Sequence, residues 1–284
     1  MAKVIVTGGA GFIGKHLVAG LRQEGFEVLV VDIKEIGDVR KPDELRAAFA
    51  GAQYVFHLAA LPRVQYSIEH PQETHDTNVN GTLNVLLAAR DCGVKRVVFS
   101  SSAAVYGDQE TMPLREDVPA LPKSPYGLHK YIGENYCKLF SELYGLQTVC
   151  LRYSNVYGPG ADPNGAYALV VAKFLQQKQA GAPLTVCGTG ENTRDYVAVE
   201  DVVRANILAA TSNAVGRAEV INIGSGQETS VNTIAALIGG KTETVEPRIE
   251  PARSVADIAR AKKLLRWEPS TAFVDGIAAM KNSI

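Results

Sequence analysis

A tyrosine and a lysine four residues apart, Tyr126 and Lys130, have the types and the spacing that acid–base chemistry requires. Pro125 would end whatever element precedes it, and the chain then runs to Tyr144 with no breaker other than glycine, which predicts a helix. Residues four apart share a helical face, so the ammonium would lie one turn from the phenol. A positive charge there lowers the pKa of a tyrosine from its usual ~10, and Tyr126 could then act as a general base. Taken alone, the pair also fits an ordinary amphipathic helix.

A glycine-rich turn near the start of the chain has the pattern of a dinucleotide-binding unit. The turn Thr7-Gly8-Gly9-Ala10-Gly11-Phe12-Ile13-Gly14 lies between a β-branched run at Val4–Val6 and a predicted helix over Lys15–Glu24, and a second strand is predicted over Val28–Val31. Gly8 would permit a tight turn, Gly11 a close approach of a pyrophosphate, and Gly14 close packing of the helix on the strand. Phe12 and Ile13 open that helix, whose N–H groups would face the phosphates.

The second predicted strand leads directly into Asp32. An acid at this place can accept hydrogen bonds from the adenosine ribose hydroxyls and would repel a 2′-phosphate, which favours NAD over NADP. Lys34 argues slightly the other way. The alternative is a glycine-rich turn with an incidental acid, but the complete order of strand, turn, helix, strand and acid favours the dinucleotide site.

Three further predicted strands end in residues that could contact a cofactor, because ligands bind beyond the carboxyl ends of strands in open parallel sheets. The candidates are Leu58, Ala59 and Ala60 at the end of Tyr54–Ala60, Ser100 to Ser102 at the end of Val94–Ser100, and Tyr153 at the end of Thr148–Tyr153. The two alanines are small enough for a cofactor to pass close to the backbone. His57 is interpreted as a hydrogen-bonded core histidine rather than a ligand.

The order of these segments predicts an α/β fold, a Rossmann-type doubly wound parallel sheet with a smaller, interleaved C-terminal substrate-binding lobe. We expect residues 1–156 to form the NAD-binding domain and residues 157–284 mainly the substrate-binding lobe, with segments near 195–225 rejoining the first domain. A long helix is predicted from Asn78 to about Asp91. Leu61–Glu73 is predicted to be an irregular loop that could reach a substrate.

The composition is that of an ordinary globular protein: 284 residues, 46% hydrophobic, 21% charged, with a formal net charge of −1. This balance gives no electrostatic footprint for nucleic acid or an acidic membrane. No apolar run approaches the ~18–20 residues that cross a bilayer, and no signal peptide is recognised, so a cytoplasmic protein is expected. The four cysteines and five histidines are scattered without metal-ligand spacing, and no metal site is predicted.

Motifs along nearly the whole chain together resemble the extended short-chain dehydrogenase/reductases, in the NAD-dependent epimerase/dehydratase group. They are the glycine turn, His57 to Ala60, Asn78 to Thr82, Ser100 to Gly107, Tyr126 to Lys130, Arg152 to Pro159, Arg194 to Asp201 and Leu264 to Pro269. Within this family the chain is most similar to nucleotide-sugar 4-epimerases of the UDP-glucose/UDP-galactose type. The resemblance implies NAD as cofactor, a nucleotide-sugar substrate, and a homodimer joined by a four-helix bundle of residues 81–91 and 127–144.

The resemblance also implies roles for individual residues. Tyr126 would be the catalytic base, Lys130 its activator and a ligand of the nicotinamide ribose, and Ser102 a partner of the sugar 4-hydroxyl. The other implied positions are Asn78 in a supporting polar network, Asp38 and Val39 against the adenine, and Asn155, Arg194 and Arg248 on the sugar diphosphate. The implied reaction is transient oxidation at C4 to a 4-keto sugar, followed by return of hydride to the opposite face.

Departures from the family pattern leave alternatives open. Ala103 and Ala104 stand where the sugar dehydratases of the family carry Asp-Glu, and alanines cannot do proton chemistry, so a dehydratase is disfavoured. A 4-keto-sugar reductase that releases NAD(P)H, a non-catalytic NAD-binding regulator, and a sugar-nucleotide decarboxylase that uses Arg63 for a carboxylate stay possible. Cys187 replaces an aromatic residue that often stacks on the base, and the segment from Asp32 to Asp38 is short. The base and the sugar are therefore left open.

Overall fold

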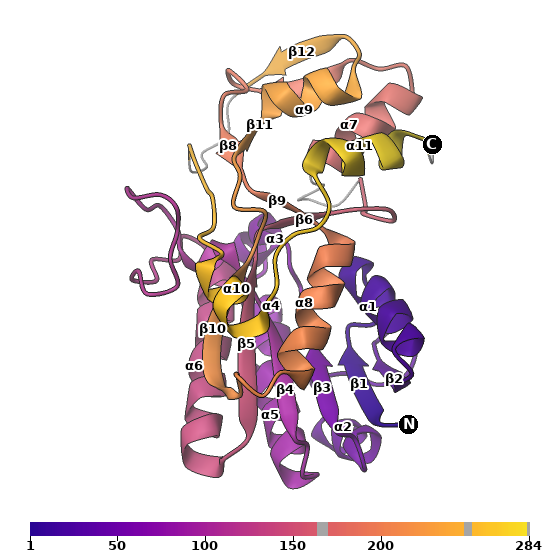
Figure 1. The fold of residues 1–284 in the computed structure, drawn as a ribbon, viewed down its shortest axis with the longest axis vertical. Coiled ribbons are helices and arrows are strands. Elements are labelled where there is room, and N and C mark those ends of the chain that lie inside the picture. The colour runs from indigo at the N-terminus through magenta and orange to yellow at the C-terminus, as the bar shows by residue number, and fades with distance from the viewer. Residues whose placement is uncertain (164–169, 247–251, 283–284) are drawn as a thin grey trace.

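Six parallel strands form the central sheet of the computed structural model, which describes residues 1–163, 170–246 and 252–282. The strands are β1 (Lys3–Thr7), β2 (Glu27–Val31), β3 (Tyr54–His57), β4 (Arg96–Ser102), β5 (Gln147–Tyr153) and β10 (Arg217–Ile223). They lie in the order β10-β5-β4-β3-β1-β2, and every neighbouring pair is parallel (Figure 1). The predicted α/β class with a doubly wound parallel sheet is confirmed.

Helices cover both faces of this sheet, which explains why its strands are apolar along most of their length. One face carries α1 (Phe12–Gln23), α8 (Val199–Thr211) and α10 (Ala259–Leu265), and the other carries α2 (Pro42–Phe49), α5 (Gly81–Asp91) and α6 (Pro125–Tyr144). Side chains alternate along a strand, so Val4 and Val6 join the core on the α1 side while Ile5 joins the core on the α5 side. Because both faces of the sheet are covered by helices, a ligand can reach it at the carboxyl ends of the strands.

The carboxyl ends of the strands face a second group of elements (Figure 1). This group contains three two-stranded pairs, β6 (Asn155–Tyr157) with β9 (Tyr196–Ala198), β11 (Thr229–Ser230) with β8 (Thr193–Arg194), and β12 (Thr242–Val245) with β7 (Leu184–Cys187). Helices α7 (Val170–Gln179), α9 (Val231–Ile238) and α11 (Phe273–Asn282) contribute to a separate core. The chain enters this second group at β6 and later returns to the central sheet, where α8 and β10 pack. The two parts of the molecule are therefore not continuous in sequence. The division at residue 157 stays a prediction.

The segment Leu61–Glu73 is largely helical, so the prediction of an irregular loop was wrong. It forms α3 (Val64–Glu69) and the start of α4 (Pro71–His75), and a π-helical turn at Asp76–Asn80 joins α4 to α5. Pro71 opens α4, where its missing N–H and fixed φ suit a helix start. The segment is too short and polar to show a helical apolar stripe, and α3 is held by packing against α6 instead.

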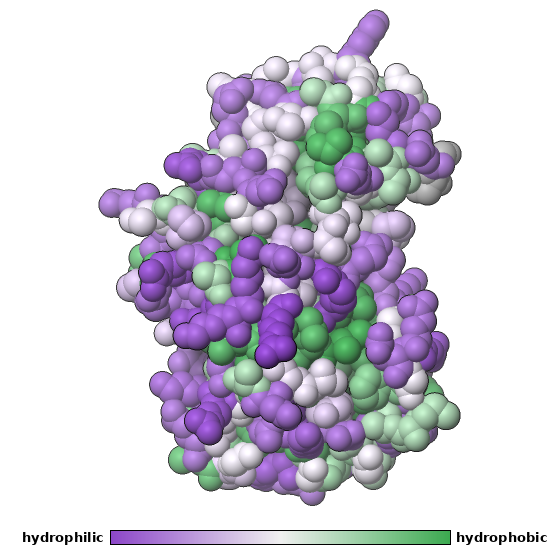
Figure 2. Space-filling view, viewed as in Figure 1, coloured by the Kyte–Doolittle hydropathy of each residue, from purple (hydrophilic) through white to green (hydrophobic). Residues whose placement is uncertain are grey.

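The outer surface is mostly polar. On the face drawn in Figure 2, hydrophilic side chains cover most of the molecule, and apolar ones gather in two places, over α8 and in the upper part of the molecule around α7, α9 and α11. Ile207 and Leu208 of α8 are only partly buried. No helix in the described part of the chain is long and apolar enough to span a membrane.

A buried arginine, Arg96, fastens the end of α8 to the sheet. Its side chain is buried, and its guanidinium donates at 2.7–2.9 Å to four backbone carbonyl oxygens, those of Ala209, Ala210, Ser212 and Val215. These carbonyls belong to the last turn of α8 or follow it, where no further helical N–H is present to bond them. A cation there also suits the negative end of the helix dipole.

Replacement of Arg96 by methionine, which keeps much of the aliphatic stem, should lower the free energy of unfolding by about 3 kcal/mol. The reason is that four interior carbonyl groups lose a charged donor. Urea unfolding followed by circular dichroism measures this. Arg115→Met is the control, because Arg115 pairs with Asp117 at an exposed site, and its effect should stay below about 0.5 kcal/mol. Equal losses in the two variants would contradict the anchoring role of Arg96.

Candidate active site

The turn between β1 and α1 is shaped by glycines that leave no room for side chains. Gly8 has a φ of +73°, and a Cβ on it would lie 2.6 Å from the amide nitrogen of Ala59. A Cβ on Gly14 would overlap the carbonyl oxygen of Gly8. A larger residue at either place would separate α1 from the strand ends. The turn therefore presents bare backbone and the first N–H groups of α1 at the carboxyl end of β1.

Asp32 follows β2 and lies beside this turn. Its Oδ2 accepts the Ala10 N–H at 3.0 Å, and its Oδ1 accepts the Lys34 N–H at 3.0 Å. Each carboxylate oxygen keeps a further lone pair for a ribose hydroxyl. A helix N-terminus for the pyrophosphate, a carboxylate for the ribose and a glycine-lined approach at Gly11 fit NAD.

A buried hydrogen-bond chain supports the end of β3. The Thr82 hydroxyl donates to the Asn78 carbonyl oxygen at 2.7 Å, so its own oxygen accepts the Nε2–H of His57 at 2.9 Å. The other ring nitrogen, Nδ1, then accepts from the Thr7 hydroxyl at 2.8 Å. Burial, assisted by the charge of Lys130, lowers the pKa of His57 to about 3, and the ring is neutral. His57 is the core histidine that its setting in the sequence indicated.

Asn78 fixes the chain just beyond β3. Its Oδ1 accepts the Leu61 N–H at 2.8 Å, and its Nδ2 donates to the Leu61 carbonyl oxygen at 3.1 Å. The side chain is buried and lies in the π-helical turn before α5. Both ends of the amide are therefore committed to backbone, and Asn78 shapes the path of the chain after Leu58, Ala59 and Ala60.

Tyr126 and Lys130 lie on one face of α6, and Ser102 ends β4 beside them. The Ser102 hydroxyl lies near enough to the Tyr126 phenol to favour its ionised form. Lys130 Nζ lies 5.9 Å from the centroid of the Tyr126 ring. Gly127 lets α6 lie close to the chain that follows β4, because a Cβ on it would lie 2.5 Å from the carbonyl oxygen of Ala104. The three predicted catalytic side chains are thus brought together at the carboxyl end of β4.

The pKa of Tyr126 is raised, which is the opposite of what its spacing from Lys130 led us to expect. Burial raises this pKa, and the nearby Ser102 hydroxyl acts against the rise. The Lys130 ammonium is directed to the strand, where it donates to the Ser100 carbonyl oxygen at 2.6 Å. It also lies 5.0 Å from the centroid of the Phe99 ring. The four-residue spacing placed both side chains on one face without bringing the ammonium to the phenol oxygen.

Lys130 is a buried cation, only 5% exposed. Burial lowers its pKa from 10.5 to about 8, while the carboxylate of Glu134, one turn along α6, favours the charged form. At neutral pH the ammonium is therefore mostly charged. The site holds a positive charge at the end of β4 with little water around it.

Glu134, which no sequence motif includes, belongs to a buried ion pair with Arg152 of β5, the first residue of the Arg152 to Pro159 motif. Arg152 Nη2 and Nε lie 2.7 and 2.8 Å from the two carboxylate oxygens, and the Ser101 hydroxyl donates to one of them at 2.5 Å. Both partners are 4% exposed. The four-residue spacing from Lys130 could have identified Glu134. Arg152 could not have been found that way, because the pairing of α6 with β5 is a tertiary contact.

Ser100 and Tyr153 are joined behind the site. The Ser100 hydroxyl donates to the Tyr153 hydroxyl at 3.0 Å, and the latter donates to Asn206 Oδ1 at 3.0 Å. Burial raises the pKa of Tyr153 to about 12, so the phenol is neutral. These bonds tie β4, β5 and α8 together, and direct cofactor contacts by the two residues stay predictions.

Asn155 and Arg194 are held near one another by the backbone of Asp195. The N–H and the side-chain Nδ2 of Asn155 both donate to the Asp195 carbonyl oxygen, each at 3.0 Å. Arg194 directly precedes Asp195, and its Nη1 donates to the Thr193 carbonyl oxygen at 2.8 Å. Arg248 lies outside the described residues.

Asp38 and Val39 occupy different settings. Asp38 pairs with Arg40 at 2.6 Å, which lowers the pKa of the Asp38 carboxyl. The side chain of Val39 is buried in the core, against Gly81. A contact between Val39 and an adenine would therefore have to come from its backbone.

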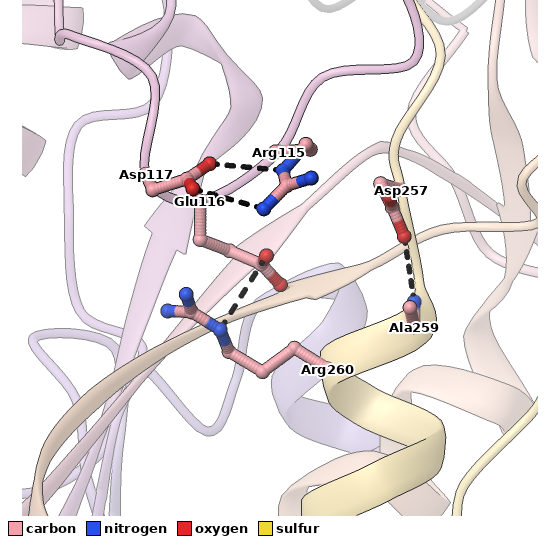
Figure 3. A pocket seen from close by; sticks show the side chains of 6 residues that line it. All are labelled: Arg115, Glu116, Asp117, Asp257, Ala259 and Arg260. Atoms are coloured by element: carbon pink, nitrogen blue, oxygen red, sulfur yellow. Dashed lines mark hydrogen bonds and ion pairs between the residues drawn. The ribbon is translucent and has the colours of Figure 1, made fainter.

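A charged pocket shown in Figure 3 contains none of the predicted site residues. It is lined by Arg115, Glu116, Asp117, Asp257, Ala259 and Arg260. Glu116 Oε1 accepts the N–H of Asn222 at 2.9 Å, and Arg260 Nε lies 3.6 Å from the other carboxylate oxygen. These contacts attach the segment after β4 to the edge strand β10 and to helix α10, and the pocket is interpreted as the margin of that attachment.

Comparison with known proteins agrees with this geometry. The model of the NAD dependent epimerase/dehydratase family matches residues 4–224. A putative UDP-glucose 4-epimerase from Methanocaldococcus jannaschii is 38% identical over 302 residues, which cover 98% of this chain and 97% of that protein. The solved UDP-glucose 4-epimerase of Thermotoga maritima with UDP-glucose is 37% identical, with a TM-score of 0.91 and coverage of 99% and 97%. The UDP-glucose 4-epimerase of Thermus thermophilus in complex with NAD is 35% identical, with a TM-score of 0.89 and coverage of 99% and 98%.

The matched region contains the glycine turn, the strand ends and the whole of α6, and relatives match nearly the full length of the chain. The chain belongs to the NAD-dependent epimerase/dehydratase family, and its cofactor is NAD.

Proposed function

We propose that this chain is a nucleotide-sugar 4-epimerase of the UDP-glucose/UDP-galactose type, which inverts C4 through a transient 4-keto sugar. One observation carries the proposal: the Tyr126 phenol lies beside the Ser102 hydroxyl and one helical turn from the Lys130 ammonium, at the same carboxyl-terminal side of the sheet as the glycine turn. The similarity to UDP-glucose 4-epimerases over nearly the whole chain supports the substrate class.

Tyr126 is the acid–base group of the proposed mechanism. In its phenolate form it takes the proton of the sugar 4-hydroxyl, and it later returns that proton to the same oxygen. Bound NAD, held by the glycine turn and Asp32, would supply the acceptor and donor of hydride for C4. The Ser102 hydroxyl, which can donate and accept, holds the sugar oxygen beside the phenol. The charge of Lys130 favours the phenolate form of Tyr126 that accepts this proton.

Asn155, Arg194 and Arg248 are the proposed ligands of the sugar diphosphate. Arginine suits this role because its planar guanidinium presents several N–H donors to phosphate oxygens. Asn155 bonds to the backbone of Asp195, the residue that directly follows Arg194, which supports their acting together. Gly8, Gly11, Phe12, Ile13, Gly14 and Asp32 are the proposed residues of the NAD site.

The chain after Ser102 favours epimerisation over dehydration. Ala103–Val105 forms a single helical turn, in which the Ala104 N–H donates to the Ser102 hydroxyl at 3.2 Å. Elimination of water across C5–C6 needs an acid and a base beside the sugar. Ala103 and Ala104 offer only methyl groups at these positions.

The purified protein should convert UDP-glucose and UDP-galactose into one another without added cofactor, since the reaction leaves NAD unchanged. Separate incubations with UDP-glucose, UDP-galactose and UDP-glucuronate, followed through the anomeric proton by NMR, measure the conversion. Tyr126→Phe should reduce the rate about 10²–10⁴-fold, because it removes only the acid–base hydroxyl. A Tyr126→Phe variant with near-normal turnover would contradict the mechanism. Failure of all three sugars, even with added NAD, would contradict the proposed substrate class.

We also propose that two copies of the chain pair through α5 and α6. Leu128, Leu139 and Leu143 lie on one face of α6 and are 45%, 46% and 68% exposed, an apolar stripe that no element of this chain covers within the described residues. Sedimentation equilibrium should give the mass of a dimer. Leu139→Arg should shift the protein to monomers, whereas Leu121→Arg, at another exposed site, should not. A monomeric wild-type protein would contradict this interface.

Lys130→Met should stabilise the cofactor-free protein at pH 7 while abolishing most activity. The folded-state pKa of about 8 lies below the unfolded value of 10.5, so the unfolded chain binds the proton more tightly. This difference destabilises the wild type by about 3 kcal/mol below pH 8 and disappears as the pH rises to 10.5. Loss of the hydrogen bond to Ser100 offsets about 1 kcal/mol. Urea unfolding from pH 7 to pH 10.5 tests this, and a gain that fails to shrink with rising pH would contradict it.

A further inference from the structure

The first turn of α6 carries Tyr126, and its backbone N–H groups need partners from outside the helix. Ser124 is the N-cap residue, and its hydroxyl accepts the Gly127 N–H at 3.1 Å. Pro125 has no N–H, and the regular helical bonds begin with Leu128, which donates to the Ser124 carbonyl oxygen at 3.0 Å. The N–H of Tyr126 therefore has no partner within its own helix.

That N–H is bound by Ser67 of α3, a residue 59 positions earlier in the chain. Ser67 Oγ accepts the Tyr126 N–H at 3.1 Å and donates its own proton to the Val64 carbonyl oxygen at 2.6 Å. The second bond turns the lone pairs of the oxygen to α6. Ser67 is fully buried, so water cannot replace it there.

We propose that Ser67 is a positioning residue, whose hydrogen bond to the Tyr126 amide holds the tyrosine in register with Ser102. This inference rests on the proposed acid–base role of Tyr126. The first turn of a helix is the part most prone to fraying, and a phenol displaced by a fraction of an ångström loses its alignment with the reacting oxygen. Ser67 keeps the turn closed where neither Ser124 nor Pro125 can.

The same contact links the catalytic helix to the neighbouring segment α3. Arg63 is the N-cap residue of α3 and lies 3.8 Å from Asp162, on the chain that follows β6. α3 is thus joined at one end to the side of the site formed by residues after β6, and through Ser67 to Tyr126. A displacement of α3 would move the tyrosine backbone directly.

Ser67→Ala removes the acceptor and leaves the Tyr126 amide buried without a partner. In the NAD-bound protein, hydrogen exchange at Tyr126 should become about 10-fold faster. kcat for UDP-galactose conversion should fall about 10-fold, with KM within about twofold of wild type, because the change affects alignment and not binding. In the Tyr126→Phe background the same substitution should change the residual rate by less than about twofold, since the residue acts through the phenol.

Ser230→Ala is the matched control. Ser230 caps α9 by accepting the Thr233 N–H at 3.1 Å, so the same substitution removes the same kind of bond far from Tyr126, and kcat should not change. Unchanged exchange at Tyr126 in Ser67→Ala would overturn the hydrogen bond itself. Fast exchange with full kcat, or equal rate losses with and without the phenol hydroxyl, would reduce Ser67 to a structural cap. If Tyr126→Phe alone kept the wild-type rate, the proposed function would be wrong. Hydrogen exchange at Tyr126 in Ser67→Ala would still show whether the bond between Ser67 and the Tyr126 amide exists.

Discussion

The site depends on keeping the Lys130 ammonium charged where water scarcely reaches it. Removing an ion from water is unfavourable unless other groups compensate, and here the compensation is partial: one carbonyl oxygen, from Ser100, and the face of Phe99. Glu134 lies one turn away, but its carboxylate is already engaged by Arg152 through two hydrogen bonds. Because Glu134 is neutralised by another partner, the positive charge of Lys130 remains available to the edge of the sheet. His57 stays neutral in the same field.

Helix α6 contains glycines that lower its intrinsic stability but allow it to pack closely on β4. Glycine inside a helix is unfavourable by about 1 kcal/mol relative to alanine, yet α6 has glycine at residues 127 and 133. A Cβ on Gly127 would press against the Ala104 carbonyl, and one on Gly133 would overlap the Phe99 ring. The helix tolerates both because its start is reinforced by Ser124, Pro125 and Ser67. The absence of a Cβ atom at Gly127 and Gly133 therefore allows α6 to pack close enough to β4 for Tyr126 to lie beside Ser102.

The parts of the fold and site that could be predicted from sequence are those that depend on local rules. The glycine turn, Asp32 and the pair Tyr126–Lys130 are each defined by spacing within one strand–turn–helix unit or one helical face. Ser67 and the pairing of Arg152 with Glu134 were not predicted because each acts on α6 from an element distant in sequence, and no spacing within one helix or turn reveals such a contact. The helix α3 was missed for a related reason: its six residues are too few for a periodic stripe, and tertiary packing holds it.

The pKa of Tyr126 could not be predicted from its spacing to Lys130 alone. The Lys130 ammonium lies 5.9 Å from the centroid of the Tyr126 ring, and a positive charge near a phenol favours the phenolate. Burial of the phenol opposes this and leaves the pKa raised. The spacing of Tyr126 and Lys130 reveals the nearby charge but not the loss of hydration on folding, which disfavours the phenolate. Only the phenolate can accept the proton of the sugar hydroxyl, so Tyr126 must lose its own proton before it acts as a base. The negative charge of that phenolate lies next to the Ser102 hydroxyl and near the Lys130 ammonium, which both favour it, and it is neutralised when the proton of the sugar arrives.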